Sequence, residues 1–331
     1  MTSLLTNIKT QIARHLILRQ HAGEMTAVVN RTKRIRRSDI LLVMCLRNEL
    51  TRLPFFCDYY RKLGVNHFLI VDNNSTDGVQ AWARSQPDIS LWHTKASYKA
   101  SKFGMEWCNV LLKKYGTGHL CVTVDPDEFL VYPCIETRSL RDLGEFLKSE
   151  KRDVLHCVML DAYSKKPLSQ TIYNTNDNPF EVCPYIDKDG YVQTVTYYGG
   201  MYTRGGPRMR FHNITQPDKS PALNKIPVVW WKRHYRYTSS MHDLMPMRLT
   251  RIEHDSRPAI TGALFHFKFF ASLSDKAAEE MHRKQHYAGS AEYKSYASAT
   301  NPILYQEGVS IRYRSPDQLI RLGLMCRGNW L

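Results

Sequence analysis

Between residues 40 and 124, short apolar runs of strand length alternate with segments of helical apolar spacing, and this order constrains the fold more than any other feature. Strand-length runs occupy 40–46, 67–71, 89–92 and 119–124, and helical spacing occupies 53–63, about 79–85 and about 99–115. Strands separated by helices form a mostly parallel sheet that is covered on both faces. We therefore predict an α/β fold with such a sheet at its centre.

Clusters of polar residues follow three of these predicted strands. Arg47, Asn48 and Glu49 follow the first run, Asp72–Asp77 ends the second, and Asp125–Glu128 follows the fourth. In open α/β sheets, ligands bind beyond the carboxyl ends of the parallel strands. One rim of the sheet is therefore expected to collect all three clusters and to form the binding site.

The third cluster is acidic. Asp125, Asp127 and Glu128 come directly after an apolar, β-branched run, with Pro126 stiffening the turn between them. Carboxylate oxygens at the rim of a sheet suit a hard cation such as Mg²⁺ or Mn²⁺, held together with a diphosphate. A lone Asp-x-Asp is also common as a solvated acidic turn, but the two other clusters at the same rim favour a reaction site.

The composition is that of an ordinary globular protein. With 331 residues and 43% hydrophobic residues, the chain can bury a sizeable core, either as one large domain or as one domain with appendages. Its 46 Lys and Arg against 31 Asp and Glu give a formal charge of +15, which favours anionic partners. Nucleic acid, an acidic membrane surface and phosphorylated substrates all meet that description, and charge alone does not choose among them.

The sequence favours a cytoplasmic location. The eight cysteines show no Cys-x-x-Cys pair, and several lie in apolar runs, which indicates a reducing compartment. No run approaches the roughly 20 apolar residues that span a bilayer, and the N-terminus lacks the features of a signal peptide. Residues 1–22 have helical apolar spacing with basic residues between, which fits a peripheral helix on the acidic inner face of a membrane. Packing of this helix on the domain, or on a second subunit of an oligomer, fits equally well.

Several ordered motifs together resemble a known family. The series Cys-Leu-Arg-Asn48-Glu49, then Asp72-Asn-Asn-Ser-Thr-Asp77, then Asp125-Pro-Asp127-Glu128-Phe resembles the nucleotide-sugar-binding half of the GT-A fold glycosyltransferases. It is most similar to the family 2 related group, whose acidic motif reads Asp-x-Asp-Glu-Phe. The chain departs from family 2 in carrying Asp72-Asn73 where an Asp-Asp pair is frequent. Later segments that are also similar to that group are Arg204-Gly-Gly-Pro-Arg208, Lys225-Ile-Pro-Val-Val-Trp-Trp, Ser240-Met-His242 and Leu264-Phe-His266-Phe-Lys268.

The resemblance implies a Rossmann-like GT-A domain with a mostly parallel central sheet, flanking helices and an acceptor-side elaboration toward the C-terminus. We expect this domain at 39–290, with a nucleotide-sugar half at about 39–135 and an acceptor half at about 136–270. A basic, amphipathic extension would precede it at 1–38, and a C-terminal extension would follow at 291–331.

The resemblance also suggests which residues bind the donor. Asp72 would contact the uracil or ribose of a UDP-type donor, because a carboxylate accepts hydrogen bonds from a base imino group or ribose hydroxyls. Asn48 and Glu49 would line the same pocket, whereas Ser75, Thr76 and Asp77 fit a simpler role as caps of the next helix. Lys102 and Lys268 would approach the diphosphate, Lys268 from the same strand face as His266; for Lys102 a basic surface turn is the plainer alternative.

By the same resemblance, Asp125 and Asp127 would hold the Mn²⁺ or Mg²⁺ that bridges the donor phosphates, with Glu128 bonding a neighbouring loop instead. The ion would act as a Lewis acid that neutralises charge on the departing nucleoside diphosphate. His266 lies in the strand-like segment Ala-Leu-Phe-His-Phe-Lys-Phe-Phe, and the family pattern makes it a further metal ligand. On residue type alone, a structural histidine is the more common interpretation.

An inverting transferase needs one group that takes the proton of the acceptor hydroxyl. His242 and Asp243 are the leading candidates, because they lie in a motif-like segment after Trp230-Trp231 on the acceptor side. A carboxylate of Asp187-Lys-Asp189 is the rival, although the following glycine marks that stretch as an ordinary turn.

The acceptor is expected to be a glycan or a lipid-linked glycan, which places the protein in polysaccharide biosynthesis. Nine Tyr and Trp residues, from Tyr185 to Tyr237, offer stacking platforms for sugars, with core packing as the simpler explanation for most of them. Arg204, Arg208 and Arg210 suggest an acceptor that carries phosphate or carboxylate.

The sequence thus predicts a metal-dependent, hexosyltransferase-type glycosyltransferase that uses a nucleotide-sugar donor. A nucleotidyltransferase is the first alternative, but such enzymes usually carry a glycine-rich signature near the first strand, and Cys45–Glu49 contains no glycine. A non-catalytic nucleic-acid or membrane-binding protein would explain the charge but would not need the carboxylate rim, so no nucleic-acid partner is expected.

Overall fold

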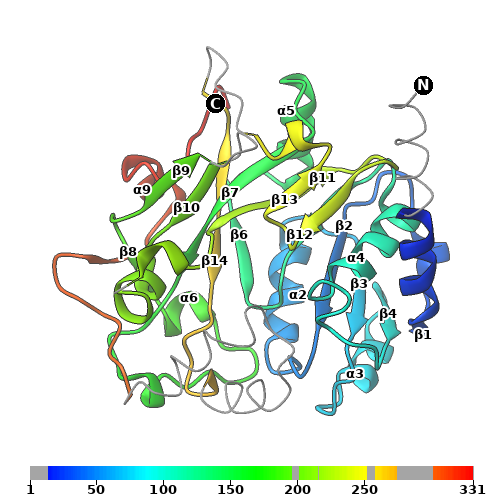
Figure 1. Cartoon of the computed structure of the whole chain (residues 1–331), viewed down its shortest axis with the longest axis horizontal. Coiled ribbons are helices and arrows are strands. Elements are labelled where there is room, and N and C mark those ends of the chain that lie inside the picture. The colour runs from blue at the N-terminus through cyan, green and yellow to red at the C-terminus, as the bar shows by residue number, and fades with distance from the viewer. Residues whose placement is uncertain (1–13, 196–200, 215, 252–257, 274–300, 331) are drawn as a thin grey trace.

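The computed structural model describes residues 14–195, 201–214, 216–251, 258–273 and 301–330. A nine-stranded sheet forms the centre of the molecule and is flanked by helices (Figure 1), which confirms the predicted α/β class. In order across the sheet, the strands are β1 (Thr26–Val29), β4 (Ile89–His93), β3 (His67–Asp72), β2 (Leu41–Leu46), β5 (Leu120–Thr123), β11 (Asn224–Trp230), β7 (Val154–Asp161), β14 (Thr261–His266) and β6 (Glu128–Val131).

The sheet is mixed, with a parallel part and a part of alternating direction. Strands β4, β3, β2 and β5 are parallel to one another, as the alternation of strands and helices predicts. Beyond β5, the only parallel neighbours are β7 and β14. β11 lies between β5 and β7 and is antiparallel to both, and β6 is antiparallel to β14. The expectation of a mostly parallel sheet therefore holds for the first part and needs correction for the second.

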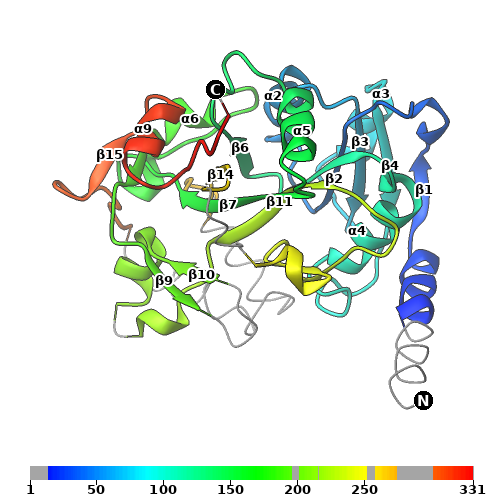
Figure 2. The same ribbon diagram turned by 90° about the horizontal axis from the view of Figure 1, so that it is seen from above.

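Each face of the sheet buries its own apolar cluster. Leu42 and Met44 of β2 belong to the cluster that includes α2 (Leu53–Lys62), α3 (Val79–Ser85) and α5 (Leu140–Ser149). Leu41 and Val43 belong to the cluster on the other face, under α4 (Met105–Leu111), and Figure 2 shows the two helical layers on either side of the sheet. Successive strand residues point to opposite faces, so a sheet covered on both faces needs the continuous apolar runs found in the sequence.

The helix expected at about 99–115 begins later than predicted. Lys102, Phe103 and Gly104 have positive φ angles of 52°, 59° and 78°, which an α-helix cannot contain. α4 therefore starts at Met105 and continues into a π-helical turn at Leu112–Gly116. A Cβ on Gly104 would lie 2.7 Å from Sγ of Cys45, so this turn can approach the end of β2 only with glycine at its tip.

Both expected extensions contribute described structure to the domain. Residues 14–23 are helical, and β1 then joins the edge of the sheet beside β4; residues 1–13, with most of the predicted amphipathic helix, lie outside the described residues. At the other end, β15 (Ser310–Arg312) pairs with β8 (Tyr185–Asp187), and the ring of Trp330 stacks on Phe146 at 5.5 Å. Residues 301–330 are thus packed against the domain, while 274–300, which include the expected domain boundary at 290, lie outside the described residues.

The smaller elements complete the chain. No helix within the described segments is long and apolar enough to cross a bilayer, and all eight cysteines carry free thiols. The remaining strands and helices are α6 (Pro179–Val182), β9 (Val192–Val195), β10 (Met201–Arg204), β12 (Arg236–Ser239), β13 (Asp243–Met245) and α9 (Pro316–Arg321), with short 3₁₀ or π turns at Thr32–Arg34, Leu168–Gln170, Arg208–His212, Pro217–Lys219 and Met247–Leu249.

Candidate functional site

Polar residues from both parts of the sheet, the parallel part and the mixed part, lie at one rim. The parallel strands β2, β3 and β5 end at this rim, and Asp72 is the last residue of β3. β7 and β14 also end here, because His266 pairs with Asp161 on one side and with Glu128, the first residue of β6, on the other. The rim therefore has a first half around Asp72 and a second half around His266.

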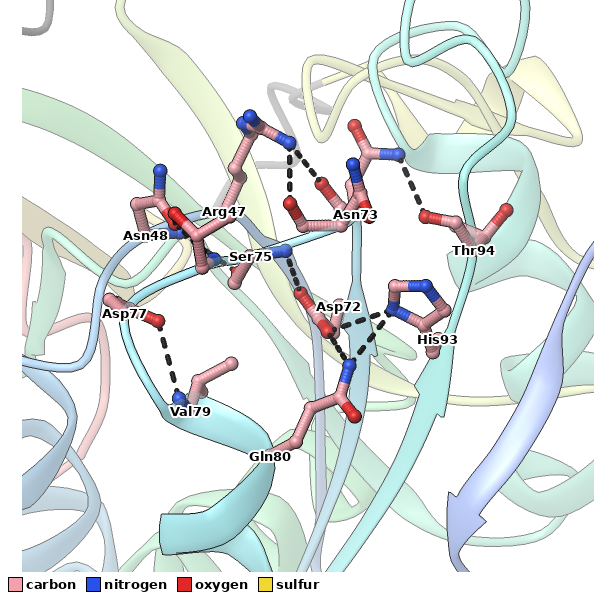
Figure 3. Close-up of polar contacts among 12 residues, drawn as sticks. Arg47, Asn48, Asp72, Asn73, Ser75, Asp77, Val79, Gln80, His93 and Thr94 are labelled. Carbon is pink, nitrogen blue, oxygen red and sulfur yellow. Dashed lines mark hydrogen bonds and ion pairs between the residues drawn. The ribbon is translucent and has the colours of Figure 1, made fainter.

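In the first half, Asp72 is the centre of a hydrogen-bonded group that we call the Asp72 cluster: Asp72, Ser75, Gln80 and His93 (Figure 3). The Asp72 carboxylate is fully buried and accepts hydrogen bonds from Ser75 N at 2.8 Å, Gln80 Nε2 at 2.8 Å and His93 Nδ1 at 3.0 Å. Burial alone would raise the pKa of Asp72, but these donors hold the pKa below its ordinary value. A side-chain hydrogen bond from Ser75 also contributes to this lowering of the pKa, so the Asp72 carboxylate is largely satisfied within the protein.

The loops after β2 and β3 are tied together beside this cluster (Figure 3). Asn48 has a positive φ of 52° and donates its backbone N–H to Ser75 Oγ at 2.9 Å. Asp77 accepts from Leu50 N at 2.7 Å and from Val79 N, the first residue of α3, at 3.2 Å. Asp77 thus contacts the first residue of the helix, although the N-cap position itself is Gly78. Asn48 bonds Ser75 of the Asp72 cluster, and its role in a nucleotide pocket stays a prediction.

Glu49 and Lys102, two further predicted donor-binding residues, have partners within the protein. Glu49 Oε2 pairs with Arg52 Nε at 2.8 Å, and Arg52 donates to the carbonyl of Phe267 at 2.7 Å. Glu49 thus links the loop after β2 to the end of β14. Lys102 Nζ lies 3.1 Å from Glu106 Oε1, but its side chain is 51% exposed, so it is able to turn toward a ligand.

In the second half, seven ionisable residues form what we call the charged cluster: Asp125, Asp127, Glu128, Asp161, Arg208, Lys225 and His266. Glu128 is buried, pairs with Lys225 Nζ at 2.9 Å and accepts the backbone N–H of Asp125 at 3.0 Å. Glu128 thus bonds its own turn and strand β11, and not a neighbouring loop as expected.

The surroundings of Asp125 in the charged cluster disfavour its anionic form. Burial of the group and the nearby Glu128 carboxylate raise the pKa of Asp125 to about 7, against the opposite pull of Lys225, whose Nζ is 3.9 Å away. The Asp125 side chain is nevertheless 46% exposed, so a ligand can reach its oxygens although protein atoms crowd it. A cation that neutralised this carboxylate would relieve the repulsion.

His266 lies between two carboxylates. Its Nδ1 is 2.7 Å from Asp161 Oδ1, and its Nε2 is 3.3 Å from Asp127 Oδ2. Asp161 in turn accepts from Arg208 Nε at 2.7 Å. Burial would lower the pKa of His266, but Asp127 and Asp161 raise it to about 9, so in the free protein the ring is protonated and both nitrogens donate.

The oxygen and nitrogen atoms of the charged cluster are chemically suited to bind a hard divalent cation. Among the described residues, no group of three or more His, Cys, Asp or Glu is already arranged to hold a metal ion. Asp125 and Asp127 nevertheless offer accessible oxygens, 46% and 21% exposed, of the kind that Mg²⁺ and Mn²⁺ prefer. Asp161 orients the His266 ring from behind, as carboxylates do for metal-bound histidines, and a metal on Nε2 would replace the proton there.

The two candidate bases differ in their suitability. His242 Nδ1 donates to the carbonyl of Asn224 at 2.6 Å, and burial together with Lys225 lowers the pKa of His242 to about 3. Burial raises the pKa of Asp243, against a hydrogen bond from Tyr202. A catalytic base works best with a pKa near the operating pH, so the lowered pKa of His242 argues against it as the base and leaves Asp243 as the remaining candidate of the pair.

Two other predicted roles need correction. Asp187, the rival base, is buried in β8, where Arg210 Nε pairs with it at 2.8 Å and the Tyr163 hydroxyl also donates to it. β14 ends at His266, so Lys268 lies in the following loop and not on the strand face of that histidine. The sequence pattern did not show this end, because the apolar run continues beyond the strand.

The arginines that suggested an anionic acceptor are engaged in the protein. Arg208 pairs with Asp161 and Arg210 with Asp187, and Arg204 donates to the Ser220 carbonyl at 3.2 Å. Their contribution to the acceptor preference is therefore weaker than the sequence suggested. Several of the aromatic candidates also serve the core, among them Trp231 and Tyr237, which are each 1% exposed.

Asp161 is not among the residues predicted from the sequence, and Lys225 has no predicted role. Asp161 ends the apolar run Val154–Leu160 just as Asp72 ends its own strand, so the same end-of-strand signal would have identified it. Lys225 lies near the start of β11, an antiparallel strand that begins at the rim where its neighbours end. Its place beside Glu128 depends on that insertion.

The chain matches no known protein-family model, and no curated protein matches it in sequence. The resemblance to the GT-A glycosyltransferases therefore rests on the sequence motifs alone.

Proposed function

We propose that the protein is a metal-dependent glycosyltransferase of GT-A type that moves a sugar from a nucleoside-diphosphate sugar, of the UDP class, to a hydroxyl of a glycan or lipid-linked glycan. The proposal is supported by two groups of residues at the same rim of the sheet. One is the hydrogen-bonded Asp72 cluster, and the other is the accessible pair Asp125 and Asp127. The first suits a base and ribose, and the second suits a cation with a diphosphate.

Strand β2 lies between β3, which ends at Asp72, and β5, which ends two residues before Asp125. Neighbouring strands are about 5 Å apart, so one ligand would be able to span the two halves of the rim across Cys45, near the end of β2. Gly104 covers this cysteine without a side chain, which leaves the backbone of the turn close to the rim. A nucleoside bound beside Asp72 would thus direct its phosphates over Cys45 toward Asp125.

In this proposal each group has a separate task. A bound cation would supply Lewis-acid neutralisation of the leaving diphosphate, with Asp125, Asp127 and His266 as the residues that hold it. Lys225 and Glu128 fix the loop that carries Asp125. Asp243 would take the proton from the acceptor hydroxyl as that oxygen attacks the anomeric carbon, which gives inversion.

The test is a screen of nucleotide sugars for release of the nucleoside diphosphate, with Mn²⁺, with Mg²⁺ and with a chelator. We expect release from at least one UDP-sugar that depends on the added cation. Pyrophosphate release from a nucleoside triphosphate and a sugar phosphate would instead indicate a nucleotidyltransferase. Absence of cation-dependent release from every donor, with equally absent binding of free UDP, would contradict the proposal.

A further inference from the structure

A groove lies at the C-terminal end of α4, and none of its lining residues belongs to the rim. It measures about 600 Å³ and lies between helix 14–23 and the segment formed by α4 and the following π turn. Figure 2 shows this helix standing out from the body beside α4. The residues that line the groove are His15, Leu18, Arg19, Val110, Lys113, Lys114 and Arg233.

The residues that line the groove carry positive charge, and no acidic residue among them neutralises it. Four of its lining side chains are Lys or Arg, one is His, and none is Asp or Glu. Three of the four cations, Arg19, Lys114 and Arg233, are exposed, so their charge acts on the solvent and not on a buried partner. Clustered cations with no interspersed acid create a field that concentrates phosphate-bearing anions.

The helix that forms one wall also exposes aliphatic side chains. Leu16 is 59% and Ile17 is 36% exposed. Leu16 precedes Arg19 by three residues, so both project from neighbouring positions on the helix surface. The helix itself is anchored, since Glu24 accepts from His21 Nδ1 and from Trp107 Nε1, both at 2.8 Å. Exposed aliphatic residues beside cations on a fixed helix are typical of an interfacial membrane helix.

We propose that helix 14–23 and this groove form a docking surface for an anionic phospholipid membrane. The cations of the groove bind lipid phosphates, and Leu16 enters the headgroup region beside Arg19. A free phosphate would leave the aliphatic residues without a role, and single-stranded nucleic acid is usually bound with aromatic stacking platforms, which none of the residues lining the groove supplies. The inference is independent of the proposed transferase activity, because it uses none of the residues of the rim.

The test is co-sedimentation of the full chain with vesicles of phosphatidylcholine alone and of phosphatidylcholine mixed with phosphatidylglycerol. We expect binding only to the anionic vesicles, weakening as salt is raised. The double variant Lys113→Gln/Lys114→Gln should weaken that binding roughly tenfold or more, from the contribution of each cation near an anionic surface. Leu16→Gln should weaken it at unchanged charge.

The matched control is Lys62→Gln/Lys151→Gln, which removes the same charge from exposed lysines near α2 and α5. This control should bind the anionic vesicles as the wild type does, and circular dichroism should show all variants folded. Equal losses in the control and groove variants would overturn the proposal in favour of net charge alone. Equal binding to neutral vesicles, no binding to either kind, or full competition by millimolar inorganic phosphate or by single-stranded RNA would also overturn it.

Discussion

The two halves of the rim use carboxylates in opposite ways. In the Asp72 cluster, one buried carboxylate is surrounded by donors from the backbone, an amide and an imidazole, and its pKa lies below the ordinary value. In the charged cluster, Asp125 lies against another carboxylate and its pKa rises to about 7. The same residue type is thus stabilised as an anion in one half and destabilised in the other.

This difference suggests that the two halves have separate tasks, nucleotide recognition in the first and metal-dependent transfer in the second. The Asp72 cluster is satisfied without a ligand, so it provides a rigid frame on which a nucleoside can be recognised. The charged cluster holds Asp125 in an electrostatically unfavourable state that a cation or a proton relieves. We therefore expect changes in the first half to alter binding, and changes in the second half to alter stability, metal dependence and turnover.

The largest effect is expected on turnover at Asp243. If Asp243 takes the acceptor proton, Asp243→Asn should reduce turnover by about 10²–10⁴-fold and leave UDP affinity nearly unchanged. His242→Ala should have a smaller effect, because the lowered pKa of His242 makes it a poor base. Turnover of both variants is measured at saturating donor, with UDP titration as the binding control. The loss of turnover should be larger for Asp243→Asn than for His242→Ala. Near-normal transfer by Asp243→Asn would remove it as the base, and a UDP affinity lowered by His242→Ala would instead assign that histidine to the metal site.

The next effect is on stability in the charged cluster. Lys225 and Glu128 are 4% and 1% exposed and pair at 2.9 Å. Lys225→Met leaves the Glu128 charge buried and unpaired, which should lower the free energy of unfolding by about 3–5 kcal/mol. Urea denaturation measures the change. The double variant Lys225→Met/Glu128→Gln removes both charges and should recover much of the loss; equal destabilisation by the single and double variants would argue against the ion pair as the cause.

In the Asp72 cluster the expected effect is on nucleotide affinity. Asp72→Ala should weaken UDP and donor alike by about 1.5–3 kcal/mol, the usual loss for a hydrogen bond to a charged group. Asp77→Ala is the control, because Asp77 holds the same two loops through Leu50 and Val79 without belonging to the cluster. Calorimetry that gave equal losses for both variants would assign the effect to loop order. A change of less than twofold for Asp72→Ala would mean that another residue recognises the nucleotide.

A smaller effect concerns pH and a histidine outside both clusters. His156 on β7 bonds the Leu249 carbonyl at 3.0 Å, and burial lowers the pKa of His156 from its ordinary 6.5 to about 4. The unfolded chain therefore binds a proton that the folded protein does not, so this residue makes stability fall as pH drops from 6.5 toward 4. Between pH 6.5 and 5.5 the loss should be about 1 kcal/mol. Urea denaturation of His156→Gln should show a shallower loss over that window; an unchanged slope would contradict the assignment.

The sequence predicts the first half of the rim better than the second for a physical reason. Strands 41–46, 67–72, 89–93 and 120–123 are each apolar runs closed by polar residues, and parallel order follows from the helices between them. Asp72 could therefore be placed from local pattern alone. The late start of α4 could not, because it depends on how closely Gly104 approaches Cys45 in space.

The second half depends on contacts between distant segments. Glu128, Asp161, Lys225 and His266 lie far apart in the chain and meet only because β11 inserts between β5 and β7 while β14 lies between β7 and β6. No local pattern encodes that order. His266 could be proposed only through the family resemblance, and the end of β14 before Lys268 is likewise set by the neighbouring strands, which end at the same rim.

We propose that Asp125 and Asp127 hold a cation together with the diphosphate of a nucleotide. Asp127→Asn keeps the size of the side chain and removes one ligand charge, so the fold should persist while most Mn²⁺-dependent UDP binding is lost. Calorimetric titration of UDP into the wild type and the variant, each with Mn²⁺ and with a chelator, is the direct test. We predict cation-dependent UDP binding in the wild type that largely disappears in the variant. A folded Asp127→Asn variant with unchanged Mn²⁺-dependent affinity for UDP would contradict the claim.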